Sequence, residues 1–252
     1  MLFRSAPFTL LGSNHTAAGG DRKGFPPAAS RTPQAAALIK QHGASVVGLQ
    51  EAKPDQVTTL QRLTGFAAYP GFAFGSKETD NSILYDTSRF EFVSGTSFPV
   101  VFESRARPQT VLRLRERATG REMYFVNMHV SAGHDARDTA SRIAGQLTGA
   151  AQLNQLMASG LPVFLTGDMN DRADFFCRVI PRTGMVAAVG GSVANGCAPP
   201  ARMPVDWVVA SPGVAFSDYW LDETPVNRRI SDHFLVSARA TVPPATEDTP
   251  EG

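Results

Sequence analysis

Hydrophobic positions along the chain follow two different periods, and segments of the two kinds follow one another. Apolar runs of strand length predict six strands: PFTLLG (7–12), ASVVGLQE (44–51), NSILYD (81–86), PVFLTGD (162–168), VDWVVAS (205–211) and FLVSARATV (234–242). Three longer segments also predict strands: FEFVSGTSFPV (90–100), TVLRLRER (110–117) and REMYFVNMHV (121–130). The tripeptide ATG between the last two indicates a hairpin turn with a glycine at positive φ.

Three other segments have apolar residues at helical spacing. In TPQAAALIKQHG (32–43), Thr32 is in position for the N-cap, Pro33 for the first helical residue and Gly43 for the C-cap. PDQVTTLQRLTG (54–65) predicts a second helix that ends at Gly65. The segment 135–158 predicts the longest helix, since its apolar residues recur at roughly helical spacing.

Strands that alternate with helices are typical of an α/β domain, and a chain of 252 residues with 42% hydrophobic residues can bury one substantial core. We therefore expect a single domain over residues 1–240. The end of the chain, 241–252, is rich in proline and polar residues, which predicts a disordered tail.

Charge gives little indication of a partner. Lysine and arginine number 24 against 23 acids, so the net charge of +1 offers no global argument for nucleic acid or an anionic membrane. Any affinity for phosphate must be local. No run approaches the roughly 18 apolar residues of a membrane helix, and MLFRSAPF is too short for a signal peptide. The sequence predicts a soluble protein.

Cys177 and Cys197 are the only cysteines, and 20 residues separate them. A disulfide between them would close a glycine-rich loop and stabilise the fold by about 3 kcal/mol, whereas the alternative is two unpaired buried thiols. A disulfide favours a secreted protein, because it persists in oxidising compartments. If the two thiols are unpaired, a cytoplasmic location is the alternative.

Polar residues stand at or just beyond the ends of several predicted strands. In a layered α/β domain, buried strands aim their terminal residues at a shared edge, so these side chains are expected to converge on one site. The residues are Glu51, His129, Asp168, Asn170, Asp206, Asp232 and His233.

The motifs GLQE, NMH, GDMN, VDWVV and SDH, in this order, resemble the endonuclease/exonuclease/phosphatase superfamily. This group of metal-dependent phosphoesterases includes deoxyribonucleases, abasic-site endonucleases, sphingomyelinases and inositol phosphate phosphatases. Each motif alone is weak, but the ordered set is specific, and the resemblance runs from about residue 7 to 240. It implies an α/β (α+β) fold, a four-layer α/β/β/α sandwich of two packed mixed β-sheets flanked by helices.

The resemblance also implies a cofactor, Mg²⁺ or alternatively Mn²⁺ or Ca²⁺, with Glu51 and Asp232 as the metal-binding acids. A divalent cation neutralises the charge on the phosphate oxygens, and Mg²⁺ prefers carboxylate oxygen and water. By the same resemblance, Asp168 orients or deprotonates the attacking water, and Asn170 donates a hydrogen bond to the phosphoryl oxygens. Taken alone, GDMN would be read as a turn.

Two histidines are implied to contact the phosphate. His233 would act as an imidazolium, with Asp206 holding its other ring nitrogen, because a carboxylate partner favours the charged form and fixes the ring. His129 resembles the second. Without the other motifs, His129 would be read as a core histidine, and Asp232 with His233 as a loop cap.

The first strand departs from the family pattern. The family has an aromatic residue, an asparagine and an aliphatic residue there, whereas this chain has Phe8, Thr9 and Leu10. Thr9 offers a hydroxyl to a carboxylate or a metal-bound water, but it lacks the amide. Asn14 could substitute from the next loop. The departure makes a weakly active or binding-only homologue an alternative.

We expect a phosphodiester substrate, with nucleic acid favoured over lipid, and a monomer. The densest basic stretch would suit nucleic-acid phosphates; it comprises Arg105, Arg107, Arg113, Arg115 and Arg117. The alternation in LRLRER equally fits the solvated face of a hairpin. Phe72, Phe74, Tyr219 and Trp220 could instead line a lipid-facing rim or pack in the core. A phospholipid (sphingomyelinase-like) or inositol phosphate phosphoesterase is therefore the alternative enzyme.

Overall fold

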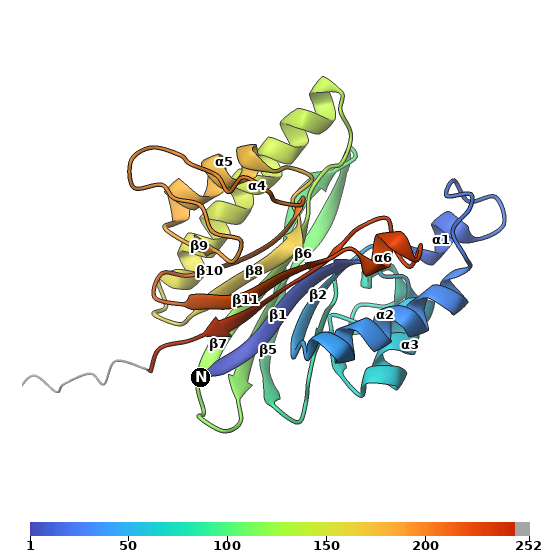
Figure 1. Ribbon diagram of the computed structural model, residues 1–252, viewed down its shortest axis with the longest axis horizontal. Helices are drawn as coiled ribbons and strands as arrows, with labels where there is room; N and C mark the ends of the chain where they lie inside the picture. Colours follow the sequence, from blue (N-terminus) through green and yellow to red (C-terminus); the bar gives the residue numbers. More distant parts are fainter. Residues whose placement is uncertain (245–252) are drawn as a thin grey trace, which may run out of the picture.

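Two six-stranded mixed sheets pack face to face in the computed structural model, which describes residues 1–244 apart from the side chain of Lys77 (Figure 1). The strands of the first sheet are, in order, β11 (Ala215–Asp222), β12 (Leu235–Thr241), β1 (Leu2–Thr9), β2 (Val46–Gln50), β4 (Ile83–Tyr85) and β3 (Ala67–Tyr69). Those of the second are β5 (Phe90–Phe102), β6 (Arg105–Glu116), β7 (Glu122–His129), β8 (Val163–Asp168), β10 (Asp206–Ala210) and β9 (Val186–Ala187). Among these strands, β1 pairs with β2 and β7 with β8 in parallel, and the other neighbours are antiparallel.

Helices cover the outer face of each sheet (Figure 1). On the first sheet, α2 (Ala28–His42) and α3 (Pro54–Thr64) bury apolar residues such as Ile39 and Leu60 against Phe8. On the second, α4 (Ala136–Met157) and α5 (Ala173–Thr183) pack against strand residues such as Leu165. The remaining helices are short: α1 (Ser13–Thr16), η1 (Ser76–Glu78) and α6 (Thr224–Asn227). The predicted four-layer sandwich is confirmed.

Aromatic side chains fill the space between the sheets. Phe3 on β1 makes edge-to-face contacts with Phe90, Phe125 and Phe164 of the second sheet, with ring centroids 5.1–5.7 Å apart. Toward the end of β2 the sheets approach more closely, and a Cβ on Gly48 would collide with the side chains of the second sheet. This close approach brings strand ends from both sheets to one place.

All three predicted helices are present. The C-terminal ends of α2 and α3 lie where they were predicted, but α2 starts earlier than predicted. Gly43 and Gly65 both adopt the left-handed C-cap conformation, and Asp135 caps α4 by accepting a hydrogen bond from the Asp138 N–H. Thr32 is not an N-cap, because α2 already starts at Ala28 and Thr32 is buried within it. Alanine is the strongest helix former, so the preceding alanines extend the helix.

The first and last strands of the structure have different boundaries from those predicted. The first strand is Leu2–Thr9 rather than 7–12, because Leu2–Ser5 pair with β12. The predicted tail begins too early: Thr241 belongs to β12, and the Val242 N–H donates to the carbonyl of Met1. Residues 245–252 of that tail lie outside the described residues.

The two longest elements that were not predicted from the sequence are α5 and β11. In α5, the buried residues Phe175, Phe176, Val179 and Ile180 follow helical spacing, but a proline lies inside the helix. The edge strand β11 is mostly exposed and carries a bulge between Ser217 and Trp220. Within residues 1–244, no helix is both long and apolar enough to cross a membrane.

The predicted disulfide between Cys177 and Cys197 is confirmed, with a Cα–Cα distance of 5.5 Å. It ties α5 to the largely exposed loop that precedes β10. Because the bond limits the freedom of the unfolded chain, replacing both cysteines with serine is expected to lower the free energy of unfolding by about 2–4 kcal/mol. Urea unfolding measures this. A reductant should destabilise the wild type and leave the double variant unchanged; equal midpoints for all four samples would contradict the prediction.

Candidate active site

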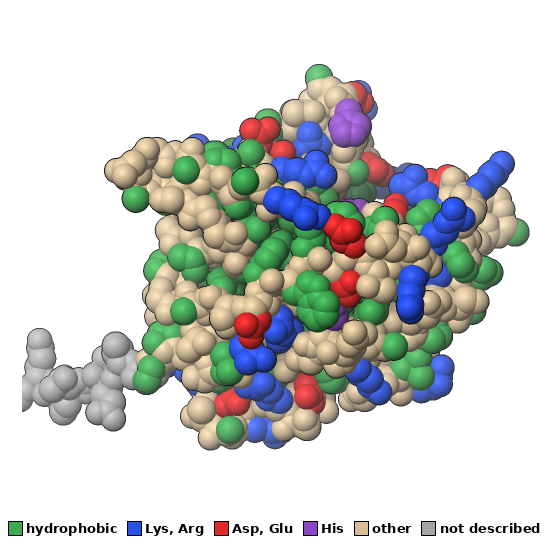
Figure 2. Space-filling view, viewed as in Figure 1, with side chains coloured by type: hydrophobic (Ala, Val, Ile, Leu, Met, Phe, Trp, Pro, Cys, Tyr) green, Lys and Arg blue, Asp and Glu red, His purple; other side chains and the backbone are tan. Residues whose placement is uncertain are grey.

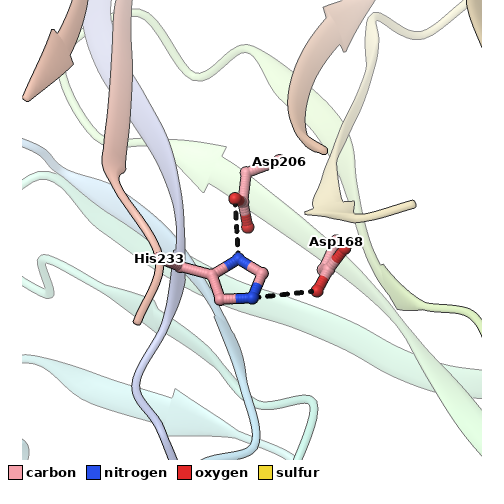
Figure 3. Close-up of side chains that lie close together, drawn as sticks. All are labelled: Asp168, Asp206 and His233. Carbon is pink, nitrogen blue, oxygen red and sulfur yellow. Dashed lines mark hydrogen bonds and ion pairs between the residues drawn. The ribbon is translucent and has the colours of Figure 1, made fainter. Parts of the chain in front are cut away.

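Asp168, Asp206 and His233 come together at the edge where the two sheets meet (Figure 3). Asp168 is the last residue of β8, and Asp206, the first residue of β10, lies directly opposite it in the antiparallel pair. His233 comes from the loop before β12 of the other sheet. One ligand atom from each lies within 4.8 Å of the others, so strand ends far apart in sequence form one cluster.

Hydrogen bonds fix the ring of His233. Its Nδ1 lies 2.9 Å from Asp206 Oδ2, while the other carboxylate oxygen of Asp206 accepts from the Thr9 hydroxyl at 3.1 Å. Thr9 is fully buried and lies equally close to Gln50. Of the two roles predicted for the Thr9 hydroxyl, the structure therefore places it on a carboxylate.

Charge at His233 is stabilised by its neighbours. Burial opposes the imidazolium, but the charge and hydrogen bond of Asp206, with the charges of Asp168 and Asp232, outweigh it and raise the pKa of His233 to about 10. The protonated ring donates Nδ1–H to Asp206, so its Nε2–H points toward Asp168 at 3.7 Å (Figure 3).

Asp168 is shifted toward neutrality by its surroundings. Burial raises the pKa of its carboxyl, and the charges of Asp206 and Glu51 raise it further, to about 7, although His233 and the Asn170 N–H oppose this. Oδ1 accepts the Asn170 N–H at 2.8 Å, and Oδ2 lies 3.7 Å from Nε2 of both His233 and His129. These distances exceed a hydrogen bond, so Oδ2 can accept a proton from a bound water.

His129 differs from His233 because its ring contacts a cation. The Arg107 guanidinium donates to Nδ1 at 3.1 Å, and its other nitrogen donates to Asp80 at 2.9 Å. Burial, followed by the charges of Arg107, His233 and Lys53, holds the pKa of His129 well below its usual range. A neutral ring that accepts at Nδ1 carries its proton on Nε2, so His129 is a neutral donor facing Asp168.

Asn170 and Glu51 share an unusual backbone. Both have positive φ, 46° and 62°, and such conformations cluster at functional sites. The amide Nδ2 of Asn170 donates one hydrogen to the Val130 carbonyl at 2.9 Å, which leaves the second for a ligand.

Gly167, the residue before Asp168, allows β8 to lie close to β7. A Cβ at this position would collide with the Met128 carbonyl, so only glycine permits this approach.

The two predicted metal-binding acids lie outside the three-residue cluster. Glu51 Oε2 accepts from the Gly12 N–H at 3.2 Å, and its side chain is 25% exposed. Asp232 is paired with Arg22 at 3.3 Å. Both acids nevertheless act on the cluster through their charge. Glu51 raises the pKa of Asp168, and Asp232 raises the pKa of His233.

The residues present fit a divalent cation. Among the described residues, Asp168, Asp206 and His233 have metal-ligand spacing, but a protonated His233 has no lone pair for a metal, so the two carboxylates are the donors that this cluster offers. Glu51 adds a partly exposed carboxylate with oxygen lone pairs left for a ligand. A Cβ at Gly12 would collide with the Asn14 amide oxygen, so Asn14 and the Glu51 carboxylate both contact Gly12. Carboxylate and amide oxygens are the ligands that Mg²⁺ and Ca²⁺ prefer.

Sequence reasoning missed the polar residues behind His129. Lys53 Nζ binds Asp80 at 3.0 Å, and Asp80 in turn binds Arg107, which continues the charged network to the histidine. The pairing of β6 with β7 could have indicated the position of Arg107. Thr110 pairs with Asn127, and extending this antiparallel register by three residues brings Arg107 to the end of β7.

Comparisons with known proteins agree with this architecture. A model of the "Endonuclease/Exonuclease/phosphatase family" matches residues 23–233. A search of the curated proteins finds no match to the sequence.

Solved structures with the same fold share little sequence identity with this chain. An endonuclease/exonuclease/phosphatase family protein from Bacteroides thetaiotaomicron is 17% identical, with a TM-score of 0.73 over 97% of this chain and 99% of that one. The mannosyl-6-phosphatase Bt3783 of the same organism is 18% identical (TM-score 0.71; 95% and 99%). The human Nocturnin catalytic domain, solved with a bound sulfate anion, is 15% identical (TM-score 0.70; 95% and 94%).

Proposed function

Because the chain belongs to the endonuclease/exonuclease/phosphatase family, whose members are phosphoesterase hydrolases, we propose that it hydrolyses a phosphodiester with a divalent cation, Mg²⁺ or alternatively Mn²⁺ or Ca²⁺. One observation carries the proposal. An acid with a pKa raised to about 7 lies 3.7 Å from a histidine with a pKa raised to about 10. Such a pair supplies a base and an acid at the same pH.

The chain's own residues take complementary roles in this proposal. A water beside Asp168 Oδ2 is oriented and deprotonated by that carboxylate as it attacks phosphorus. The protonated His233 donates Nε2–H to a phosphoryl or leaving oxygen as negative charge grows, while Asp206 holds Nδ1. The neutral His129 and the free amide hydrogen of Asn170 donate further hydrogen bonds.

Glu51 and Asp232 are proposed to hold the cation, with Asn14 as an additional ligand in place of the family asparagine. When bound, the metal neutralises charge on the phosphate oxygens. The partial exposure of Glu51, and the contact of both Glu51 and Asn14 with Gly12, support this assignment.

Changing Glu51→Gln is expected to raise the Mg²⁺ concentration for half-maximal activity by about tenfold or more, because a ligand charge is lost. Activity is titrated with Mg²⁺, and calorimetry follows Mg²⁺ binding without substrate. Glu223→Gln is the matched control, since Glu223 is an exposed acid paired with Arg202. Equal Mg²⁺ requirements for Glu51→Gln and wild type would remove Glu51 from the metal site.

A nuclease remains the first candidate, although few arginines support it. Arg113 pairs with Glu122, and Arg115 pairs with Glu122 and Glu91, which is the solvated hairpin face that the alternation predicts. Arg107 contacts the site through His129. Basic and acidic side chains are interspersed over the face shown in Figure 2. Recognition is therefore proposed to be local.

The aromatic residues considered for a lipid rim do not lie together. Phe72 and Phe74 are exposed near β3, whereas Trp220 lies on β11 and stacks on His42 with ring centroids 4.2 Å apart. Tyr219 is half-buried, and burial, with the charge of Asp206, raises the pKa of its phenol to about 12. A phospholipid or inositol phosphate substrate stays the alternative.

The disulfide supports a further proposal, that the protein is secreted and works in an oxidising compartment. A monomer is also proposed. The main proposal is tested with plasmid DNA, RNA, sphingomyelin, phosphoinositides and bis-p-nitrophenyl phosphate, each with Mg²⁺, Mn²⁺ and Ca²⁺ and with EDTA. Hydrolysis that EDTA abolishes supports it. Binding without turnover on every substrate would leave the binding-only homologue, and turnover only on lipids would favour the alternative enzyme.

A further inference from the structure

A pocket of about 900 Å³ opens beside the catalytic cluster. One wall is the segment 69–81, which follows β3, and the other is the tip of the β5–β6 hairpin. Its volume lies in the range of sites that bind small molecules or one unit of a larger ligand. None of the predicted catalytic residues lines it.

Arg107 and Asp80 connect this pocket to the reacting groups. Both line it, and Arg107 also donates to His129, whose Nε2 lies 3.7 Å from Asp168. One side chain, that of His129, therefore separates the pocket-lining Arg107 from the Asp168 carboxylate. A group esterified to a phosphate at Asp168 and His233 can extend past Arg107 into the pocket.

The pocket walls combine aromatic faces with unused polar groups. Phe74 is 62% exposed, and the Arg107 guanidinium lies 4.0 Å from the centre of the Phe102 ring. Arg105 is exposed and forms no ion pair among residues 1–244. Asn81 also lines the pocket but is 3% exposed, and its amide nitrogen donates to the Pro108 carbonyl.

This lining discriminates between classes of ligand. An acyl chain would have to cover Asp80, Arg105 and Arg107 and would lose their hydration, which is costly. A duplex is too wide for the pocket and would meet the carboxylates of Glu78 and Glu103 on its walls. A flat ring with hydrogen-bonding edges matches both features, because it stacks on the aromatic faces and offers donors and acceptors to the polar groups.

We propose that this pocket binds the nucleoside attached to the scissile phosphate, so that the protein acts on unpaired nucleotides and not on the interior of a duplex. The inference rests on the proposed phosphodiesterase function and narrows its substrate to single strands, chain ends and dinucleotides. Phe74 stacks on the base, and Arg105 binds its polar edge or the sugar.

Two synthetic diesters with one leaving group separate this inference from the function on which it rests. Thymidine 5′-(p-nitrophenyl phosphate) carries a nucleoside, and methyl p-nitrophenyl phosphate does not. The wild type is expected to cleave the nucleoside ester with a kcat/KM at least tenfold higher. Cleavage of neither ester would overturn the proposed function, whereas equal values for both would overturn the pocket assignment alone.

The matched pair Phe74→Ala and Phe72→Ala tests the pocket residue by residue. Both residues are exposed in the same segment, but only Phe74 lines the pocket. Phe74→Ala is expected to raise KM for the nucleoside ester by about tenfold, at least five times its effect on the methyl ester, because a stacking face is lost. Phe72→Ala should leave both esters unchanged. Equal effects of the two variants would contradict the proposal.

Binding without turnover gives a second readout. Calorimetry with dAMP and AMP should show binding to the wild type that Phe74→Ala weakens by about tenfold, and comparing these two nucleotides, which differ only in the 2′-hydroxyl, distinguishes a DNA from an RNA unit. Mannose 6-phosphate and glycerophosphocholine are titrated in the same way, to test a sugar and a lipid headgroup as alternative ligands. Tighter binding of either of these would overturn the nucleoside assignment and leave the proposed phosphodiesterase chemistry standing.

Discussion

Replacing His233 with alanine is expected to lower kcat by about 10² to 10⁴, the usual contribution of a positioned proton donor. The ring is protonated at neutral pH, because its pKa is raised to about 10, and Nε2–H is directed at Asp168. The variant loses the group that donates to the phosphate oxygens as charge develops. Asp206→Asn should lose much of the same activity, since its carboxylate holds Nδ1 at 2.9 Å.

The double variant His233→Ala/Asp206→Asn should lose little more than His233→Ala alone, because two residues that act as a unit are not additive. Rates are measured with saturating metal on the best substrate, and circular dichroism confirms folding. His134→Ala is the control, as His134 is an exposed histidine of α4's preceding loop. Equal activity of wild type and His233→Ala at every metal concentration would remove the enzymatic role and leave a binding protein.

The sequence predicted that Asp168, Asp206 and His233 lie together, because each is tied to a strand end. Asp168 and Asp206 follow or open short apolar runs, and antiparallel pairing places them opposite each other. His233 precedes the last apolar run and reaches the same edge from the other sheet. Strand periodicity and order along the chain are local properties, so they can be read without knowing the packing.

The second layer of the site depends on packing that local patterns do not encode. Asp80 lies between η1 and β4, and nothing in its neighbours indicates that it will meet Arg107 from the tip of a distant hairpin. Thr9 looked like the loss of a family asparagine, yet its buried hydroxyl orients Asp206. Such contacts arise only when the two sheets pack together.

The pH dependence of the reaction tests the role of Asp168. Its pKa is raised to about 7, so the carboxyl is protonated below that pH and cannot accept a proton from water; activity should therefore rise as the pH increases through about 7. His233 stays protonated up to about pH 10, so activity should fall above it. A plot of kcat/KM from pH 5 to 11 should be bell-shaped, and its two apparent pKa values belong to the coupled pair.

Two substitutions test which residue causes each limb of the pH–activity curve. The Asp206 carboxylate raises the pKa of both Asp168 and His233, so Asp206→Asn should move both limbs to lower pH. Asp168→Asn should reduce kcat/KM by about 10² to 10⁴, since the amide cannot accept the proton, and its residual activity should lack the acidic limb. Asp171→Asn is the control, because Asp171 lies three residues further along and pairs with Arg178 at 3.2 Å. A residual curve that still rises through pH 7 in Asp168→Asn would mean that another group is the base.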